Sequence, residues 1–361
     1  WVDYMNNPHS PLRTGTNAHA PYHPIEFWTV GNEPDRLINP ATGKTFTVAD
    51  YVNAFIAYSK FMHQNDPNIK VFGPEISQFY GIGAGPTDAS GNLWMEDFLK
   101  GVGAYEKANH VILLDGVSFH RYQFDNASQA PAMLMSSPDE WDYLLPSLQQ
   151  LIRQDLGRDV PIAVTEVNSN PTTAVPTPGV AALWWADTLG RLMSQQVEYV
   201  GFFSTEGVER PYPLFTVDNH RSASGANINL QQTAMLRVMQ LYSHLQHNLV
   251  PVEVQREPIS MYATQDDSHQ TVSLIFINKS NTIQLAQVSA QNQLFSISPW
   301  HNLDITLLGY SIVVVTLHRG GGAEAYSYIV PTLNNPAVQP VNHTRCGNKT
   351  DPLSYSPYIP C

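Results

Sequence analysis

The sequence predicts an α/β protein that carries a small antiparallel β domain toward its C-terminal end. Apolar runs of strand length alternate with longer runs of helical periodicity up to about residue 250 of the 361 residues. The five strand-like runs are almost continuously apolar, which is typical of parallel strands covered on both faces. Later runs are β-type, with turn residues between them. The alternation fits either a barrel or a doubly wound sheet.

The predicted strands are short and end abruptly. The first, IEFWTV, is read as a buried strand and is followed by Gly-Asn-Glu-Pro, where the proline cannot donate a hydrogen bond to a sheet. The five predicted strands are 25–30, 69–74, 113–120, 160–167 and 198–205.

Five longer segments are predicted as helices. In the first, Thr47 is a candidate N-cap with Asp50 as its acidic partner three residues later. In the third, Ser137 suits the N-cap and Pro138 the first helical position, whereas Pro146 is expected to bend or split the helix. The predicted helices are 47–64, 92–106, 137–156, 179–196 and 230–246.

The sequence divides into three predicted parts: an α/β part over 1–249, a β domain over 250–318 and an extended tail over 319–361. The tail is rich in Gly, Pro and Asn and offers little core material. It contains the only two cysteines, Cys346 and Cys361, which can close one disulfide loop in an oxidising compartment.

Composition excludes several classes of function. Hydrophobic residues make up 43% and charged residues 14%, as in a globular chain with a large core. The formal net charge is −12 and Lys and Arg do not cluster, which argues against nucleic acid and anionic membranes as partners. No apolar run approaches the ~20 residues of a membrane span. A neutral or basic ligand fits better, and the 11% aromatic content suits sugar platforms as well as core packing.

Ionisable side chains lie at the C-terminal ends of all five predicted strands, either in the last residues or directly after them. In chain order they are Glu33 (behind Asn32), Glu75, His120 (with Tyr122), Glu166 (before Asn168) and Glu206. In a parallel α/β barrel, the groups at the C-terminal ends of the strands meet at one face. We therefore expect a polar pocket ringed by carboxylates.

Two neighbouring carboxylates with aromatic walls suit the hydrolysis of a glycosidic bond. One carboxylic acid protonates the leaving oxygen, and the other attacks the anomeric carbon or activates water. A like charge close by raises the pKa of an acid. We therefore expect one carboxylate of the pair to raise the pKa of the other, which then acts as the acid.

The motif WTVGNEPD, followed far along the chain by AVTEVN, resembles the clan of retaining glycoside hydrolases built on (β/α)8 barrels. The resemblance implies that Glu33 is the acid/base, Asn32 a ligand of the sugar 2-hydroxyl and Glu166 the nucleophile. It implies that 25–30 is the fourth barrel strand and 198–205 the eighth. It places His120 and Tyr122 near the nucleophile.

Further substrate contacts are expected from Trp28, Asn168 and Glu206. The β domain resembles that of the clan's arabinofuranosidase-, xylosidase- and glucuronidase-like families, which implies an antiparallel β-sandwich. We expect no cofactor and no metal. Where many relatives carry Trp on the eighth strand, this chain has Phe202, Phe203 and Glu206. The resemblance therefore does not identify the sugar that the enzyme would bind.

The resemblance leaves the first three barrel strands outside this chain. The segment 1–15 then corresponds to the end of the third helix and its loop. A barrel that lacks three strands has two edge strands with unpaired backbone groups. We therefore expect an additional N-terminal segment or a second chain to complete it. A homo-oligomer or an assembly through the tail is a further possibility.

Four Asn-x-Ser/Thr sites are candidate glycosylation sites: Asn126, Asn278, Asn342 and Asn348. Together with the two cysteines they favour a secreted, extracellular glycoprotein. The main hypothesis is a retaining glycosidase acting on a polysaccharide or glycoconjugate. The alternative is a catalytically inactive, glycosidase-like structural or glycan-binding surface protein.

Overall fold

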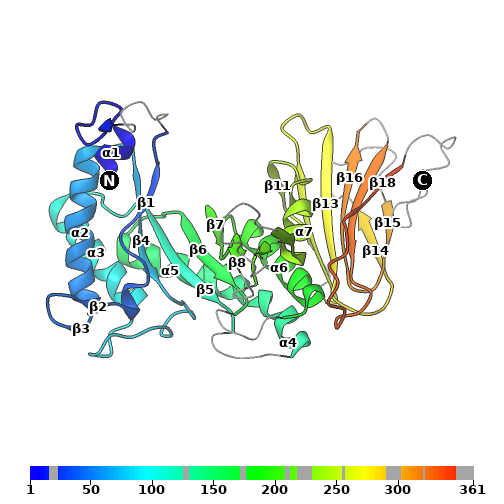
Figure 1. Cartoon of the computed structure of the whole chain (residues 1–361), viewed down its shortest axis with the longest axis horizontal. Helices are drawn as coiled ribbons and strands as arrows, with labels where there is room; N and C mark the ends of the chain where they lie inside the picture. The colour runs from blue at the N-terminus through cyan, green and yellow to red at the C-terminus, as the bar shows by residue number, and fades with distance from the viewer. Residues whose placement is uncertain are drawn as a thin grey trace. The chain divides into compact units, whose positions relative to one another are not determined.

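The computed structural model describes residues 1–15, 23–124, 130–170, 176–207, 212–217, 230–253, 257–289, 302–319 and 322–346. Two compact units form (Figure 1). The first consists of Trp1–Tyr122, Asp142–Val167 and Val197–Phe202, and the second of Gln123–Trp141, Asn168–Gln196 and Phe203–Cys361. Within the described residues, no helix is both long and apolar enough to cross a membrane.

A five-stranded sheet forms the centre of the first unit and confirms the predicted α/β class. Its order is β1-β4-β5-β6-β7, which is also the order along the chain. The pairs β1/β4, β4/β5 and β6/β7 run parallel, as in one half of a barrel. The strands are β1 (Phe27–Thr29), β4 (Lys70–Ile76), β5 (Gly116–Tyr122), β6 (Ile162–Asn168) and β7 (Tyr199–Phe202).

The strands differ in burial because of their place in the sheet. The central β5 is buried along its whole length. The outermost β1 is not, and Phe27 keeps 48% of its surface exposed. The prediction of a buried first strand is therefore wrong, because β1 pairs on one side only and the described residues place no element against its other edge.

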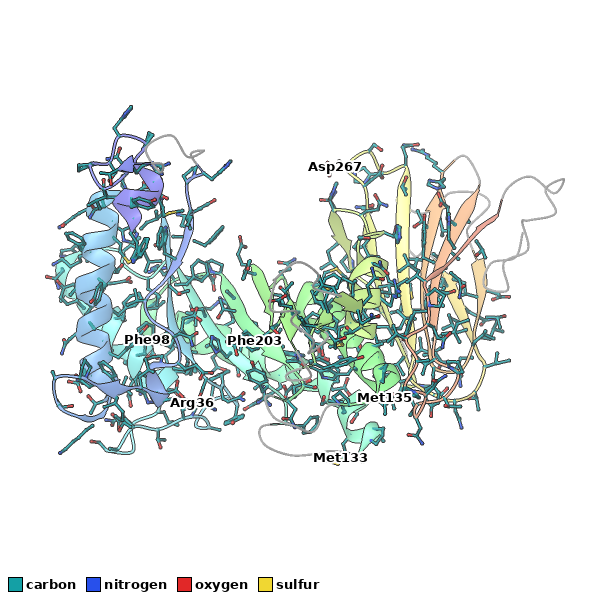
Figure 2. All side chains as sticks on the ribbon, viewed as in Figure 1. Arg36, Phe98, Met133, Met135, Phe203 and Asp267 are labelled. Carbon is teal, nitrogen blue, oxygen red and sulfur yellow. The ribbon has the colours of Figure 1, made fainter. Side chains whose placement is uncertain are left out.

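Helices cover the first unit, with α2 (Val48–Asn65) and α3 (Trp94–Asn109) beside β1 and β4 (Figure 1). The predicted capping box is confirmed: Thr47 Oγ1 accepts from Asp50 N, and Asp50 Oδ2 accepts from Thr47 N. The helices meet through Phe55 of α2 and Phe98 of α3, which pack edge to face with ring centroids 5.1 Å apart. Phe98 is labelled in Figure 2.

The third predicted helix begins later than expected. The 3₁₀ turn Ser137–Glu140 holds Ser137 and Pro138, and α5 spans Trp141–Leu156. Pro146 lies inside α5 without splitting it. Smaller elements of the first unit are α1 (Val2–Asn6), the 3₁₀ turn Pro34–Arg36, β2 (Ile38–Asn39) and β3 (Lys44–Thr45).

The second unit is built on a six-stranded antiparallel sheet of order β11-β12-β13-β16-β17-β18. Ile305 and Leu307 of a separate hairpin pack against Phe276 and Val313 of this sheet, so the predicted second sheet of a sandwich is present. The strands are β11 (Asn248–Val250), β12 (Ile259–Gln265), β13 (Thr271–Asn278), β16 (Ser311–His318), β17 (Ala323–Ile329), β18 (Asn342–Cys346), and the hairpin β14 (Gln284–Ser289) and β15 (Asn302–Leu307).

Among its described residues, the second unit also contains three α-helices, the 3₁₀ turn Ser137–Glu140 and a small sheet. The helices and strands are α4 (Pro131–Ser136), α6 (Pro178–Ser194), α7 (Ala234–Tyr242), and the strands β8 (Glu206–Gly207), β9 (Phe215–Val217) and β10 (Leu230–Gln232). The predicted helix over 230–246 is thus replaced at its start by β10, and α7 begins after the N-cap Thr233, whose hydroxyl accepts from Met235 N.

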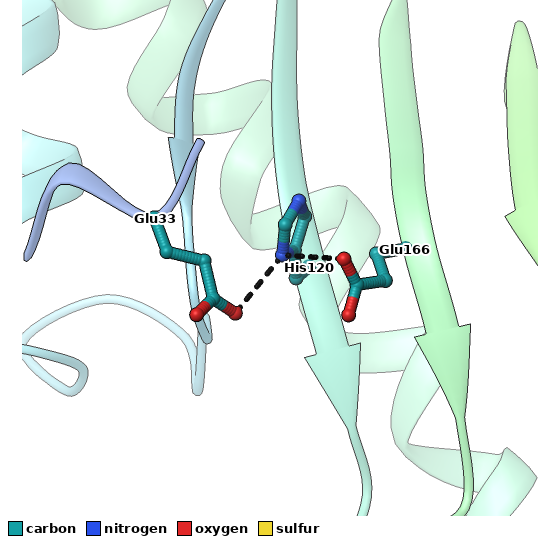
Figure 3. Close-up of side chains that lie close together, drawn as sticks. All are labelled: Glu33, His120 and Glu166. Carbon is teal, nitrogen blue, oxygen red and sulfur yellow. Dashed lines mark hydrogen bonds and ion pairs between the residues drawn. The ribbon is translucent and has the colours of Figure 1, made fainter. Parts of the chain in front are cut away.

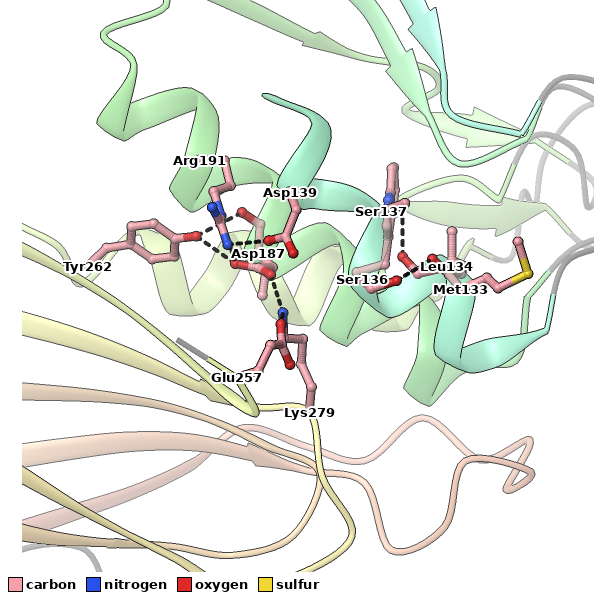
Figure 4. Close-up of polar contacts among 12 residues, drawn as sticks. Met133, Leu134, Ser136, Ser137, Asp139, Asp187, Arg191, Glu257, Tyr262 and Lys279 are labelled. Carbon is pink, nitrogen blue, oxygen red and sulfur yellow. Dashed lines mark hydrogen bonds and ion pairs between the residues drawn. The ribbon is translucent and has the colours of Figure 1, made fainter. Parts of the chain in front are cut away.

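The predicted boundary at 249/250 falls inside the second unit, because α6 is joined to the β-sheet by buried polar contacts (Figure 4). Asp187 of α6 is fully buried, accepts from Lys279 Nζ at 2.8 Å and from Tyr262 Oη at 2.5 Å. Glu257 also contacts Lys279, at 2.6 Å. A Cβ on Gly190 of α6 would lie 2.0 Å from the Tyr262 ring, so helix and sheet are in close contact.

The prediction of an extended tail from residue 319 is wrong for two segments. β17 pairs with β16, and β18 pairs with β17. Buried Ala323, Ala325 and Tyr328 supply core material that composition alone did not indicate. Cys346 is the last residue of β18, whereas Cys361 lies outside the described residues, so the disulfide stays a prediction.

Candidate active site

Glu33 lies just after the C-terminal end of β1, in a left-handed backbone conformation with φ of 45°. Such a conformation is costly for a residue with a side chain and is typical of functional sites. It is held by a hydrogen bond from Glu33 N to the carbonyl of Glu75 at 2.8 Å, and by the 3₁₀ turn that Pro34 begins. Arg36 of that turn brings its Nε to 3.7 Å from Glu33 Oε2.

His120 of β5 lies between the two predicted catalytic carboxylates (Figure 3). Its Nδ1 is 3.1 Å from Glu33 Oε1 and 3.5 Å from Glu166 Oε2. The neighbouring parallel strands β5 and β6 bring His120 and Glu166 together, as the strand-end prediction expected. One carboxylate oxygen each of Glu33 and Glu166 and one ring nitrogen of His120 lie within 4.8 Å of one another.

Exposure separates the residues that can touch a ligand from those that cannot. The side chains of Glu33 and Glu166 keep 22% and 19% of their surface exposed. Those of His120 and Glu75 keep 2% and 4%. Tyr122, two residues beyond His120, is buried and donates its hydroxyl hydrogen to Glu166 Oε1.

A third carboxylate, that of Glu75, contacts His120 on the buried side of the site. Glu75 of β4 places Oε2 at 3.1 Å from His120 Nε2 and accepts a hydrogen bond from Thr165 Oγ1 at 2.8 Å. Like Glu33, it has a left-handed backbone, with φ of 59°. The register of β4 against β5 shifts at this position, so Glu75 lies at a local irregularity of the sheet.

The charges of the site shift its pKa values in opposite directions. Burial by itself would lower the pKa of His120, but contacts with Glu33, Glu75 and Glu166 outweigh it and raise the pKa to about 9. The hydrogen bond from His120 lowers the pKa of Glu33, although burial opposes this, and Arg36 adds to the lowering. Burial and the contact with Glu166 raise the pKa of Tyr122.

The expectation that a like charge raises the pKa of the acid is therefore wrong for Glu33. The nearest charged group to its carboxylate is the imidazolium of His120, and an opposite charge at hydrogen-bond distance favours the ionised carboxylate.

Glu33, His120 and Glu166 are close enough for a single metal ion. The hydrogen-bond partners of His120, however, favour a proton on each of its ring nitrogens. A histidine ligand coordinates through a deprotonated ring nitrogen. Here both ring nitrogens lie 3.1 Å from carboxylate oxygens, Nδ1 from Glu33 and Nε2 from Glu75. The arrangement fits a protonated imidazole that donates on both sides.

Two predicted substrate contacts precede Glu33 in the chain. Asn32 is exposed next to it, which is compatible with the predicted contact to a sugar. Trp28 of β1 is partly exposed, and its Nε1 donates to the carbonyl of Ile25 at 2.9 Å. Its role in binding stays a prediction.

Asn168 and Glu206 occupy different environments. Asn168 is fully buried, and its amide donates to the carbonyls of Phe203 at 2.7 Å and Tyr212 at 3.0 Å. This corrects the expected substrate contact, because the side chain holds loop backbone instead. Glu206 is exposed on β8.

The sequon prediction is wrong for Asn278. Its side chain is fully buried and its amide donates to the carbonyls of Thr282 and Leu308, both at 2.9 Å. Asn342 is exposed on β18 and stays a candidate. Asn126 and Asn348 lie outside the described residues.

Sequence reasoning missed Arg36 and Thr165. Arg36 follows Glu33 by three residues, a spacing that brings side chains together across one helical turn. Thr165 directly precedes Glu166, but its contact with Glu75 depends on how β4 and β6 are placed, which no local signal reveals.

Comparisons with known proteins give a consistent result. The family model described as Glycosyl hydrolases family 39 matches residues 17–343. A search of curated proteins finds no match. Solved structures match in fold at low sequence identity.

Two of these structures are enzymes of glycoside hydrolase family 44, and a third is an arabinofuranosidase. A family 44 xyloglucanase from Paenibacillus polymyxa has a TM-score of 0.64 and 14% identity, over 88% of this chain and 69% of that one. A family 44 endoglucanase from Clostridium acetobutylium has a TM-score of 0.61 and 14% identity, over 88% and 70%. An α-L-arabinofuranosidase from Thermotoga maritima has a TM-score of 0.59 and 15% identity, over 88% and 72%. Their likeness in fold supports the barrel and not the doubly wound sheet.

Proposed function

Because the chain belongs to glycosyl hydrolases family 39, we propose that this glycosidase works with retention of configuration, through Glu166 as nucleophile and Glu33 as acid/base. The supporting observation is the approach of the two carboxylates, which bring one oxygen each within 4.8 Å. Retaining enzymes hold their carboxyl groups about 5–5.5 Å apart, whereas inverting enzymes leave about 6.5–9.5 Å for a water molecule.

The proposed reaction has two displacements. A Glu166 carboxylate oxygen attacks the anomeric carbon while the bond to the leaving oxygen breaks, and that oxygen takes the proton of Glu33. Water then attacks the same carbon, gives a proton to Glu33 and releases Glu166. Tyr122 holds Glu166 by its hydroxyl hydrogen, and His120 keeps the two carboxylates in place from the buried side.

The proposed substrate is a polysaccharide or glycoconjugate. The fold relatives are named as a xyloglucanase, an endoglucanase and an arabinofuranosidase, which suggests a plant-type glycan. The exposed Asn32 beside the acid/base is proposed to bind the sugar 2-hydroxyl.

We also propose that further polypeptide, either another segment or a second chain, covers the open edges of the five-stranded sheet. Exposed aromatic side chains lie on both edge strands, Phe27 on β1 and Tyr199 on β7. Amide hydrogen exchange at β1 tests the proposal. It should be slower in the protein isolated together with its partner segment or chain than in this chain alone. Equal exchange in both preparations would refute it.

Secretion is proposed from the sequons and the cysteine pair of the sequence. Detection of the protein in culture medium, with intact cells as the reference fraction, tests this. Protein found only within cells would contradict it.

A mechanism-based 2-fluoro-sugar with a good leaving group tests the enzymatic proposal. We expect a covalent adduct on the peptide that contains Glu166, and none in the Glu166→Gln variant. Glu33→Gln should lower turnover of aryl glycosides by several orders of magnitude, whereas Glu198→Gln, an exposed carboxylate at the edge of the same unit, serves as the unaffected control.

An intact, folded protein that no member of a fluoro-sugar panel labels would favour the alternative of an inactive glycan-binding protein. Labelling of a residue other than Glu166 would contradict the assigned roles.

A further inference from the structure

We propose that Glu75 is a positioning residue that fixes the protonation of His120 and the backbone of Glu33, so that three carboxylates and one imidazolium act as one unit. This inference rests on the proposed function of Glu33 and Glu166. Glu75 itself does not reach the substrate, because its side chain keeps only 4% of its surface exposed.

The backbone of Glu75 is the first link. Its carbonyl accepts the hydrogen of Glu33 N at 2.8 Å, and both residues have left-handed backbones, with φ of 59° and 45°. A left-handed backbone costs free energy at a residue with a side chain and persists only where surrounding contacts hold it. The main chain of Glu75 thereby sets where the side chain of Glu33 begins.

The side chain of Glu75 is the second link. Oε2 is 3.1 Å from His120 Nε2, while the opposite ring nitrogen faces Glu33 Oε1 at 3.1 Å and Glu166 Oε2 at 3.5 Å. A neutral imidazole has only one N–H, so it can donate to carboxylates on one side only. Carboxylates on both sides therefore select the doubly protonated ring.

Burial strengthens this dependence. A buried carboxylate needs a compensating charge or several hydrogen bonds. Glu75 receives one hydrogen bond from Thr165 Oγ1 at 2.8 Å and one from His120, and its Oε1 is buried without a hydrogen-bond partner among the described residues. The imidazolium is the only positive group that the described contacts give it, so each of the two charges stabilises the other.

The consequence reaches the reacting pair. The positive ring lies between Glu33 and Glu166 and reduces their mutual repulsion. It also keeps the pKa of Glu33 low. Loss of the Glu75 charge should lower the pKa of the His120 ring and allow the pKa of Glu33 to rise.

The test is the titration of His120 in Glu75→Gln, followed by NMR of histidine-labelled protein and assigned with His120→Gln. We expect the His120 pKa to fall by about one to three units, the effect of losing one charge at this distance. The alkaline limb of kcat/KM should move to higher pH in the same variant. Glu96→Gln, another buried carboxylate of this unit that contacts the backbone of Gly83, is the matched control and should leave the titration of His120 unchanged.

Either of two results would overturn the inference. A folded Glu75→Gln protein in which His120 titrates as in the wild type would overturn it. If this variant does not fold, the wild type still decides, because a neutral His120 at pH 7 would overturn it as well. Neither reading needs turnover, so a protein that no fluoro-sugar labels but that shows the shift would refute the proposed function and keep the role of Glu75.

Discussion

At the scale of single residues, the site depends on a cation placed between anions. His120 separates Glu33 from Glu166 and is itself held from behind by Glu75. The carboxylates alone would repel one another, and the buried ring gives them a shared partner. Polar residues of this kind are usually hydrogen-bonded when buried, and here the hydrogen bonds also fix the reactive groups.

The lowered pKa of Glu33 predicts the pH dependence of activity. The acid must carry a proton to protonate the leaving oxygen, and its pKa lies below the ordinary value of 4.5 because His120 and Arg36 stabilise the carboxylate. The protonated fraction therefore falls as pH rises through that value. We expect kcat/KM of the free enzyme to increase as pH is lowered from 7 toward 5. The pKa that governs this alkaline limb should lie below 4.5, the ordinary value for glutamate.

A pH series of kcat/KM with an aryl glycoside measures this limb. Arg36→Gln removes one of the two cations without touching His120, so its limb should move to higher pH. A wild-type optimum at or above pH 7 would contradict the prediction.

At the scale of elements, close packing overrides local preference. Gly103 lies in the middle of α3, where alanine would normally stabilise a helix by about 1 kcal/mol. A Cβ at this position would lie 2.2 Å from the carbonyl oxygen of Asp155 at the end of α5. Backbone cannot move aside as a flexible side chain can, so the glycine is set by the helix–helix contact.

We therefore expect Gly103→Ala to lower the free energy of unfolding by about 2 kcal/mol, within the usual cost of overpacking. Urea unfolding followed by circular dichroism gives the value. Lys107→Ala, exposed on the same helix, should change it by less than about 0.5 kcal/mol. A Gly103→Ala protein as stable as the wild type would show that α3 and α5 are not in this contact.

At the scale of the whole molecule, the fold decides which sequence motifs can be used. The sequon at Asn278 reads as well as the one at Asn342, yet β13 buries Asn278 and the edge strand β18 exposes Asn342. A glycan on Asn278 would break two hydrogen bonds to backbone carbonyls and could not fit into the buried site.

Expression in a eukaryotic secretory host tests this difference by mapping of deglycosylated peptides. Folded protein should carry no glycan at Asn278, whereas Asn342 is open to modification. Asn278→Asp should leave the glycan mass unchanged and lower stability, because a carboxylate cannot donate the two hydrogen bonds. Occupancy of Asn278 in folded protein would contradict the buried position.

The sequence by itself determined the parallel α/β unit, its strand and helix order and the strand-end carboxylates. These follow from local signals: apolar runs, the Thr47–Asp50 capping box, and polar residues placed where strands end. Because parallel strands align their C-terminal ends, Glu33, His120 and Glu166 had to come close.

Only the tertiary structure decided the rest. Long-range contacts set the positioning by Glu75 and Thr165, the buried amides of Asn168 and Asn278, the attachment of α6 to the β-sheet and the strands of the expected tail. Each depends on which distant groups become neighbours on burial. A buried polar group must then find its hydrogen bonds among those neighbours, and a local sequence pattern does not contain them.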